Sequence, residues 1–295
     1  MGRQERATGC LILEAATSSG RMGARGIDLV RKGVWFPVEH DGLMYHIQLK
    51  KGDVGRYVLL PGDPGRCSLI AEYFDHAEKI AQNREYTTYA GYLLGEKVAV
   101  MSTGIGGPSA AIGVEELAAV GADTFIRVGT SGGVQPVTRV GDLVITSAAV
   151  RDEGTSQQYM PLAFPAVADL DVTLALREAA GRLGVPYHVG VTQSKDSFYG
   201  ELQPERMPVA DQLLSRWKAW MAGGVLCSEM EAAAIFVVSS VLRKRAGGIM
   251  LVIGSQELLS QSPEEHARRV DLDPLIRTAV EAVKILIQKD RAASA

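Results

Sequence analysis

Three separated arginines are the residues whose type and surroundings most clearly suggest chemistry in this sequence. Arg66 ends a Pro-Gly-Asp-Pro-Gly segment, Arg84 precedes Glu-Tyr-Thr-Thr, and Arg127 precedes Val-Gly-Thr-Ser-Gly-Gly. Turns rich in glycine and hydroxyl residues expose backbone N–H groups, and arginine adds a planar, permanently charged set of donors. Together these groups are suited to bind a compact oxyanion such as phosphate.

A fourth polar segment, Ser102–Ser109, contains the run Gly-Ile-Gly-Gly. Such a run can be no more than a tight turn between a strand and a helix. It does not complete the dinucleotide-binding pattern G-x-G-x-x-G, because Ser109 stands where the last glycine would be. The sequence also lacks a G-x-x-x-x-G-K-[ST] loop, so the common nucleotide-binding folds are disfavoured.

The overall composition excludes several classes of protein. A formal net charge of -3 over 295 residues gives no general attraction to nucleic acid or to an anionic membrane. The three cysteines are widely spaced, which argues against a disulfide scaffold or a zinc site and favours a reducing compartment. The most apolar stretch, residues 232–242, is too short to span a bilayer. We therefore expect a cytoplasmic protein.

Short apolar runs alternate with longer helical patterns along the chain. The expected strands are 57–60, 98–101, 124–128, 143–148, 188–193 and 249–253, and the expected helices are 109–120, 172–183, 229–243 and 274–288. This alternation predicts a single α/β domain with a mostly parallel, twisted mixed sheet flanked by helices. We place a poorly patterned extension at 1–38, the domain at 39–290 and a tail at 291–295.

The polar segments are expected to meet at one edge of this sheet. Pro61, Ser102 and Gly129 each follow a predicted strand. Ligands of open α/β sheets bind at the carboxyl ends of the strands. The three turns should therefore open onto a common site.

The order of these segments identifies a family resemblance. The matching segments are 61–66, 84–89, 102–109, 115–117, 127–132, 164–169, 196–199 and 229–231. Over about residues 42–288, the chain resembles the nucleoside phosphorylase-I family and is most similar to its uridine-cleaving members. The resemblance implies a pentosyltransferase that uses phosphate to convert uridine to uracil and ribose 1-phosphate. It also implies a homodimer whose sites are completed across the interface, with no organic cofactor.

The same resemblance assigns the phosphate-binding residues. Gly62, Arg66, Arg127 and Thr130 would bind phosphate from one subunit, and Arg84 would come from its neighbour. The three arginines would be the catalytic residues, because they place and stabilise the attacking phosphate. Taken singly, each arginine would more often be a solvated or ion-paired residue.

The ribose-binding residues are assigned in the same way. Glu231 and Met230 would hold the sugar, with the carboxylate accepting hydrogen bonds from its hydroxyls. His46 would reach the ribose 5′-hydroxyl across the dimer. A competing interpretation makes Glu229 and Glu231 ordinary acids at the start of a helix, where the helix dipole favours them.

The uracil-binding residues are less regular than those of the relatives. Phe198 would stack near the nucleoside, and Gln203 and Arg206 would recognise the edge of uracil. Two residues separate Gln203 from Arg206, whereas relatives with a simple uracil clamp have one between them. Residues 252–257 also differ from the family's lid, which carries an Asn-Arg pair in bacterial relatives.

A cation site is a further implication of the resemblance. Glu85, Ile105 and Ser109 match positions that hold a cation at the dimer interface in some relatives. A carboxylate, a carbonyl and a hydroxyl are oxygen ligands suited to potassium, sodium or calcium.

Three alternatives to uridine phosphorolysis remain open from the sequence. A purine nucleoside phosphorylase is disfavoured because Ser255-Gln256 lacks the acid that purine-specific relatives place near this point. A nucleosidase, which uses water, would not need three arginines around its nucleophile. A catalytically silent nucleoside-binding relative would explain the altered lid and the longer segment before Arg206. Use of thymidine or deoxyuridine is also left open.

Overall fold

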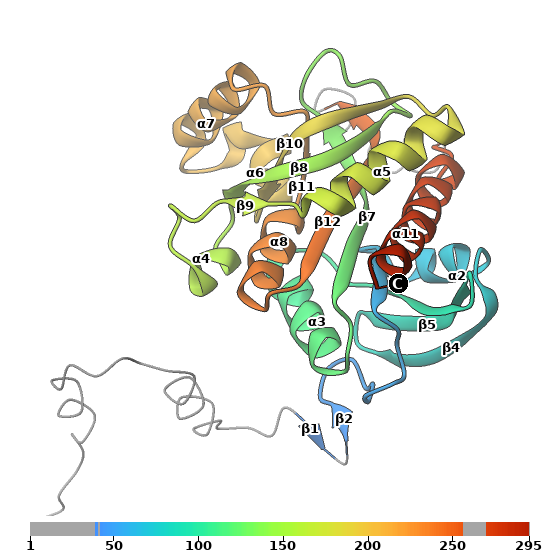
Figure 1. The fold of residues 1–295 in the computed structure, drawn as a ribbon. Helices are drawn as coiled ribbons and strands as arrows, with labels where there is room; N and C mark the ends of the chain where they lie inside the picture. The colour runs from blue at the N-terminus through green and yellow to red at the C-terminus, as the bar shows by residue number, and fades with distance from the viewer. Residues whose placement is uncertain (1–38, 41, 256–269, 295) are drawn as a thin grey trace, which may run out of the picture. The chain divides into compact units, whose positions relative to one another are not determined.

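A mixed β-sheet with helices on both faces positions the candidate site (Figure 1). The computed structural model describes residues 39–40, 42–255 and 270–294. The strands are β1 (Glu39–His40), β2 (Leu43–Met44), β3 (Tyr57–Leu60), β4 (Asp75–Asn83), β5 (Tyr86–Leu93), β6 (Glu96–Met101), β7 (Thr124–Gly133), β8 (Leu143–Asp152), β9 (Ala166–Val167), β10 (Tyr187–Lys195), β11 (Cys227–Glu229) and β12 (Arg245–Ser255). The helices are α2 (Gly65–Ala71), α3 (Gly107–Ala119), α4 (Thr155–Tyr159), α5 (Leu170–Leu183), α6 (Phe198–Leu202), the 3₁₀ turn η1 (Pro204–Arg206), α7 (Ala210–Ala222), α8 (Ala232–Val241) and α11 (Asp273–Ser294).

The strand order of the main sheet is β11-β10-β8-β12-β7-β3-β6-β5-β4. Its neighbours β12-β7-β3-β6 and β8-β10-β11 pair in parallel, whereas β8-β12 and the β6-β5-β4 meander pair antiparallel. Strand β11 also pairs antiparallel with β7, so β7, β12, β8, β10 and β11 close into a ring. The carboxyl ends of β7 and β10 are thereby brought together around β11.

Two apolar layers hold the helices against the sheet. One layer contains the buried sides of α2, α5 and α11, and the other contains α3 and α8. Figure 1 shows α5 and α11 lying side by side over one face of the sheet. Helix α8 is buried from Ala232 to Ser239, which explains why its sequence is apolar on all sides. The loop between β11 and α8 therefore leads directly into a buried helix.

The predicted α/β domain with a mixed sheet and flanking helices is confirmed. Strand β7 continues to Gly133, so the residues after Val128 that were predicted as a turn are strand. The predicted helix at 229–243 begins only at Ala232, because Cys227–Glu229 pairs with β10 and β7 as strand β11. The β4-β5 hairpin was missed because most residues of β4 are exposed and lack apolar alternation.

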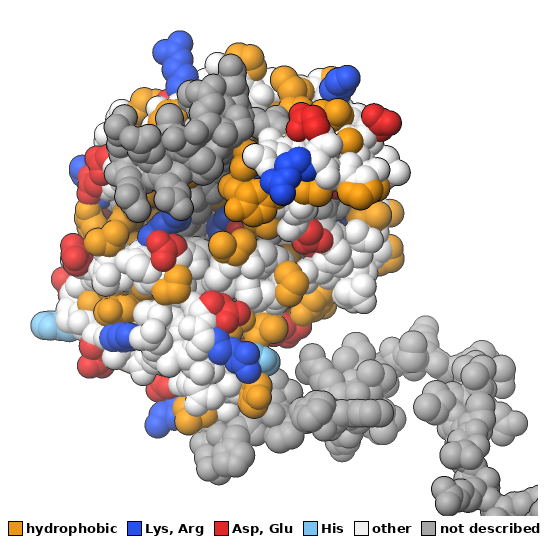
Figure 2. Space-filling model, turned by 180° about the vertical axis from the view of Figure 1, so that it is seen from behind, with side chains coloured by type: hydrophobic (Ala, Val, Ile, Leu, Met, Phe, Trp, Pro, Cys, Tyr) orange, Lys and Arg blue, Asp and Glu red, His pale blue; other side chains and the backbone are white. Residues whose placement is uncertain are grey.

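The C-terminal helix crosses the predicted boundary between the domain and its tail. Residues 1–38 lie outside the described residues, so the predicted extension is not tested. Helix α11 continues through Ser294, past the domain end predicted at 290. No helix in the described part of the chain is long and apolar enough to cross a membrane. On the face in Figure 2, described basic and acidic side chains are interspersed.

Candidate active site

The loops that follow β3 and β6 are joined by backbone hydrogen bonds. Thr103 N–H donates to the Pro61 carbonyl at 2.9 Å, and Gly104 N–H donates to the Gly62 carbonyl at 3.0 Å. A Cβ on Gly62 would come within 3.1 Å of the Gly104 carbonyl oxygen, and Gly104 has φ of +70°. Glycine at both positions lets the loops approach this closely. Two of the three predicted turns therefore meet, whereas Gly129 lies within strand β7.

A cavity of about 680 Å³ opens beside these loops. Its lining includes these residues that the sequence assigned to phosphate, ribose or base: Gly62, Arg66, Arg127, Thr130, Phe198, Met230 and Glu231. They come from the loop after β3, from α2, from β7, from the β11-α8 segment and from α6. The fold thus unites residues that are far apart in the sequence.

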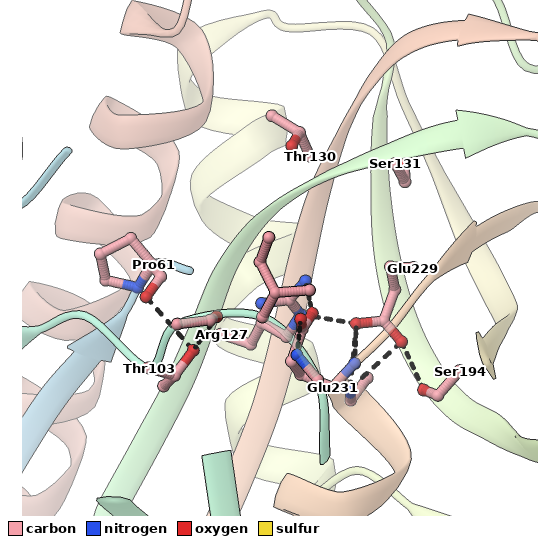
Figure 3. Close-up of polar contacts among 12 residues, drawn as sticks. Pro61, Thr103, Arg127, Thr130, Ser131, Ser194, Glu229 and Glu231 are labelled. Atoms are coloured by element: carbon pink, nitrogen blue, oxygen red, sulfur yellow. Dashed lines mark hydrogen bonds and ion pairs between the residues drawn. The ribbon is translucent and has the colours of Figure 1, made fainter. Parts of the chain in front are cut away.

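Arg127 lies at the centre of this site between two carboxylates (Figure 3). Its Nε donates to Glu229 Oε2 at 2.6 Å, and its Nη2 forms an ion pair with Glu231. Burial by itself lowers the pKa of Arg127, but Glu231 and Glu229 outweigh that effect, so the pKa rises. The guanidinium is therefore charged. Its buried Nη1 has no hydrogen-bond acceptor among the described residues, which leaves a donor for a bound anion.

Arg66 supplies a second positive charge to the same cavity. Its Nη2 donates to Thr130 Oγ1 at 3.2 Å, and its Nε lies 4.0 Å from Asp63. Burial lowers the pKa of Arg66, and the positive charge of Arg127 lowers it further. An anion bound between the two guanidinium groups would relieve this repulsion.

Glu229 fixes both Arg127 and the start of α8. It accepts hydrogen bonds from the backbone N–H groups of Glu231 and Ala232, each at 2.9 Å, and from the Ser194 hydroxyl. Glu229 belongs to strand β11, and its side chain caps the start of α8. Because the same carboxylate holds Arg127, it also determines where that guanidinium lies.

Glu231 presents a buried carboxylate to the cavity. Its Oε1 accepts from Gly106 N–H at 2.6 Å, and its other oxygen pairs with Arg127. Burial raises the pKa of the Glu231 carboxyl, while Arg127 opposes the rise. This acceptor stands beside the two cationic groups, where a sugar next to a bound phosphate would lie.

The cavity is also lined by Lys195 and Glu201, an ion pair that the sequence did not reveal. Lys195 Nζ lies 3.0 Å from Glu201 Oε1 and donates to Ser228 Oγ at 2.7 Å. The Ser228 hydroxyl in turn donates to Glu201 Oε2 at 2.9 Å. The one available signal was the position of Lys195 directly before the matched segment 196–199, at the predicted carboxyl end of a strand.

Gln203 and Arg206 do not line this cavity. They are hydrogen-bonded to each other, and Arg206 is exposed on η1. The longer segment before Arg206 is accommodated by α6 and η1, which turn the chain away after Leu202. Their role in uracil recognition stays a prediction.

Arg84 and His46 also lie outside the cavity of their own chain. Arg84 is exposed, with φ of +51°, at the tip of the β4-β5 hairpin. His46 Nδ1 lies 2.6 Å from Glu116 Oε1, and Glu116 also accepts the backbone N–H groups of His46 and Ile47. Glu116, whose role the sequence did not reveal, thus orients the His46 ring.

The three residues assigned to a cation are neighbours. Ser109 Oγ lies 3.4 Å from the Ile105 carbonyl oxygen, and the Glu85 side chain packs against Gly104. Among the described residues, no group of three or more His, Cys, Asp or Glu side chains could hold a metal. A cation here would therefore need carbonyl and hydroxyl ligands as well as Glu85.

The fold and site belong to a known class of enzymes. The family model described as Phosphorylase superfamily matches residues 56–287, and the chain belongs to this superfamily. Among curated relatives, uridine phosphorylase of Treponema pallidum is 54% identical, over 83% of this chain and 95% of the relative. Uridine phosphorylase of Thermococcus kodakarensis is 47% identical, over 86% and 90%. Guanosine phosphorylase of Halorubrum lacusprofundi is 38% identical, over 82% and 98%.

Proposed function

We propose that this protein is a uridine phosphorylase, which reversibly converts uridine and phosphate to uracil and ribose 1-phosphate. The observation that carries the proposal is the placement of Arg127 and Arg66 beside the Glu231 carboxylate in one cavity. This arrangement offers an anion site next to an acceptor for sugar hydroxyls. The similarity to uridine phosphorylases over more than four fifths of the chain supplies the substrate class.

The chemistry follows from these positions. Phosphate held by Arg66 and Arg127 attacks C1′ of the ribose as the C1′–N1 bond breaks. The sugar passes through an oxocarbenium-like state, which the nearby phosphate oxygens stabilise. Glu231 orients the ribose by accepting its hydroxyl hydrogens. The base leaves with the electron pair of the broken bond and takes up a proton from solvent.

Phosphate is favoured over water as the nucleophile. Arg127 lowers the pKa of Arg66, so placing these two guanidinium groups together is unfavourable without an anion. Water gains nothing from such a pair, whereas phosphate is bound and neutralised by it. This argument separates a phosphorylase from a nucleosidase.

Guanosine is the second candidate substrate. It is suggested by the similarity to the guanosine phosphorylase of Halorubrum lacusprofundi. Uracil and guanine share a ring N–H next to a carbonyl group, so one set of protein groups can bind either edge. The two candidates are separated by substrate tests.

A homodimer is proposed to complete each site. Arg84 and His46 lie outside the cavity of their own chain, Arg84 is exposed, and Glu116 orients the His46 ring. Ile105 lines the cavity with 78% of its surface exposed, which suits a contact with a second copy. In such a dimer, Arg84 would add a third positive charge to the partner's phosphate.

An interface cation is proposed with the dimer. One chain offers the Glu85 carboxylate, the Ile105 carbonyl and the Ser109 hydroxyl, and two chains would offer twice as many oxygen ligands. That number matches the roughly six to eight ligands that a hard cation takes. The cation would stabilise the dimer, and we assign it no chemical step.

A cytoplasmic location is proposed from the cysteine usage. Cys67 and Cys227 are buried free thiols, as is common in a reducing compartment.

The deciding experiment follows base release from uridine, thymidine, guanosine, inosine and methylthioadenosine, each with and without phosphate. Release of uracil from uridine only in the presence of phosphate is the expected result. Faster phosphate-dependent cleavage of guanosine or inosine would reassign the base, and cleavage without phosphate would make the enzyme a hydrolase. A folded protein without turnover on any of them would be a silent relative.

A further inference from the structure

We propose that Lys195 and Glu201 recognise the nucleobase, by binding the ring N–H and the neighbouring carbonyl oxygen of uracil. This inference rests on the proposed function and names the residues that determine its base specificity. It assigns to Lys195 and Glu201 the role that the sequence predicted for Gln203 and Arg206.

The order of strands places this ion pair where the base must lie. Strand β3 pairs with β7, β7 pairs with β11, and β11 pairs with β10. Arg66 follows β3 and Thr130 belongs to β7, and both line the part of the cavity that we assign to phosphate. Glu231 follows β11, and Lys195 ends β10. In phosphorolysis, the sugar carbon lies between phosphate and base, so the residues beyond Glu231 face the base.

The contacts show that the pair is a built site. Lys195 is 7% exposed, and its Nζ contacts both Glu201 and Ser228 in a closed triangle of polar atoms. Its Nζ also lies 6.0 Å from the centre of the Phe198 ring, which lines the same cavity. A flat ring packed against Phe198 would bring its polar edge to this triangle.

The charges of the pair are complementary to an imide edge. A carboxylate only accepts hydrogen bonds, so Glu201 suits the N3–H of uracil, and the Lys195 ammonium only donates, so it suits O2 or O4. Lys195 also meets the negative charge that develops on the ring oxygens as the base leaves. Because Lys195 neutralises Glu201, the carboxylate does not repel the departing base.

Cytosine is disfavoured by the same arrangement. Its N3 is an acceptor and would face the Glu201 carboxylate without a hydrogen between them. A site built to bind an N–H group rejects an analogue that lacks it, by about 10⁴-fold or more in favourable cases. Discrimination at N3 is therefore the property that this pair should control.

The test compares uridine with 3-methyluridine, whose N3 carries a methyl group in place of hydrogen. The variant is the double substitution Lys195→Met with Glu201→Ala, which removes both charges and leaves room for the methyl group. Removing a buried ion pair as a unit avoids an unpaired charge and preserves the fold better than either single change. kcat/KM is measured for both nucleosides with saturating phosphate in the full-length protein.

The wild-type enzyme should prefer uridine by about 1,000-fold or more, and the double variant by about 10-fold or less. Glu201→Gln retains one acceptor oxygen, so it should lower the preference less than Glu201→Ala, which removes the acceptor. These single variants also serve if the double variant does not fold, because an unchanged preference in a folded Glu201→Ala protein would contradict the proposal.

A competing pair of substitutions, Gln203→Ala with Arg206→Met, decides between the two sets of residues. If that variant loses the preference while the Lys195 and Glu201 variant keeps it, the inference is overturned. A wild-type protein that releases no base from uridine would instead overturn the proposed function, and the inference with it.

Discussion

Arg127 Nε donates to Glu229 Oε2 across 2.6 Å, and this bond joins β7 to β11 inside the cavity. Neither side chain reaches solvent to any useful extent, since Arg127 is 4% exposed and Glu229 is 3% exposed. The carboxylate that orients the guanidinium also accepts the first N–H groups of α8. The position of the proposed phosphate-binding guanidinium and the start of α8 therefore depend on the same pair.

Replacing Arg127 should impair both activity and stability. Arg127→Ala removes a phosphate donor, and loss of one such donor typically lowers kcat by about 100- to 1,000-fold. It also leaves two buried carboxylates without their cation, at a cost of about 3–5 kcal/mol in the free energy of unfolding. Urea denaturation and phosphorolysis assays measure the two effects. Wild-type turnover in a folded Arg127→Ala protein would refute the phosphate assignment.

Arg66→Ala is the matched control for that variant. Within the part of the chain that the structure describes, Arg66 donates one hydrogen bond, to Thr130, and its ion-pair partner Asp63 is exposed. Its loss should cost about 0.5–1.5 kcal/mol in stability while still lowering activity through weaker phosphate binding. Equal destabilisation by the two substitutions would contradict the structural role given to Glu229.

The pH dependence should reflect Glu231. Burial raises its pKa, so the carboxylate becomes protonated above the ordinary glutamate pKa of about 4.3. Protonation ends the ion pair with Arg127 and removes an acceptor for ribose. kcat/KM for uridine should therefore fall as the pH decreases through this raised pKa, after correction for the ionisation of phosphate. An acid limb at or below the ordinary value would contradict the prediction.

The stability effect of the same group has the opposite sign. The pKa of Glu231 is higher in the folded than in the unfolded state. Its contribution to the free energy of unfolding is therefore fully present below the unfolded-state pKa. It is lost as the pH rises through the folded pKa. Relative to wild type, Glu231→Gln should therefore become more stable as the pH rises across this window. Denaturant titrations at several pH values measure the free energy of unfolding of both proteins. A difference between wild type and Glu231→Gln that does not change with pH would contradict the prediction.

Two defective variants should restore activity when combined. Arg127→Met keeps Arg84 intact, and Arg84→Ala keeps Arg127 intact. In a dimer whose sites draw on both chains, a mixed dimer has one complete site. After random exchange of subunits, about a quarter of the wild-type activity should return. Activity no greater than the sum of the two variants would show that Arg84 acts within its own chain or not at all.

Gly104→Ala should weaken phosphate binding through the backbone. Gly104 has φ of +70°, and an added Cβ would lie 2.8 Å from Glu85 Cγ. The left-handed conformation alone costs about 1–2 kcal/mol for an alanine. Displacement of the loop at Gly62 should also raise the KM for phosphate, which steady-state kinetics would measure.

Gly184→Ala provides the control for that substitution. Gly184 has φ of +65° and nothing within 4 Å of an added Cβ, and it lies after α5 away from the cavity. It should lose a similar amount of stability with no change in the KM for phosphate. If both variants raised that KM equally, the loop contact would not be the cause.

The sequence by itself determined the α/β class, most of the strands that end at the site, and the segments that we propose bind phosphate. Local apolar runs reveal buried strands, and Arg66, Arg127 and Glu231 lie directly beside segments whose composition is distinctive. These signals are local, so they can be found without knowing which strands are neighbours. The contacts of Glu231 with Gly106 and Arg127, in contrast, required the fold.

The tertiary structure decided which groups share the cavity. Lys195, Glu201 and Ser228 come from β10, α6 and β11, and no local pattern predicts that a lysine will meet that glutamate. Gln203 lies one residue after the cavity lining, yet it is turned away with Arg206 by η1. The closure of β11 onto both β10 and β7 depends on long-range pairing, which sequence spacing alone does not specify.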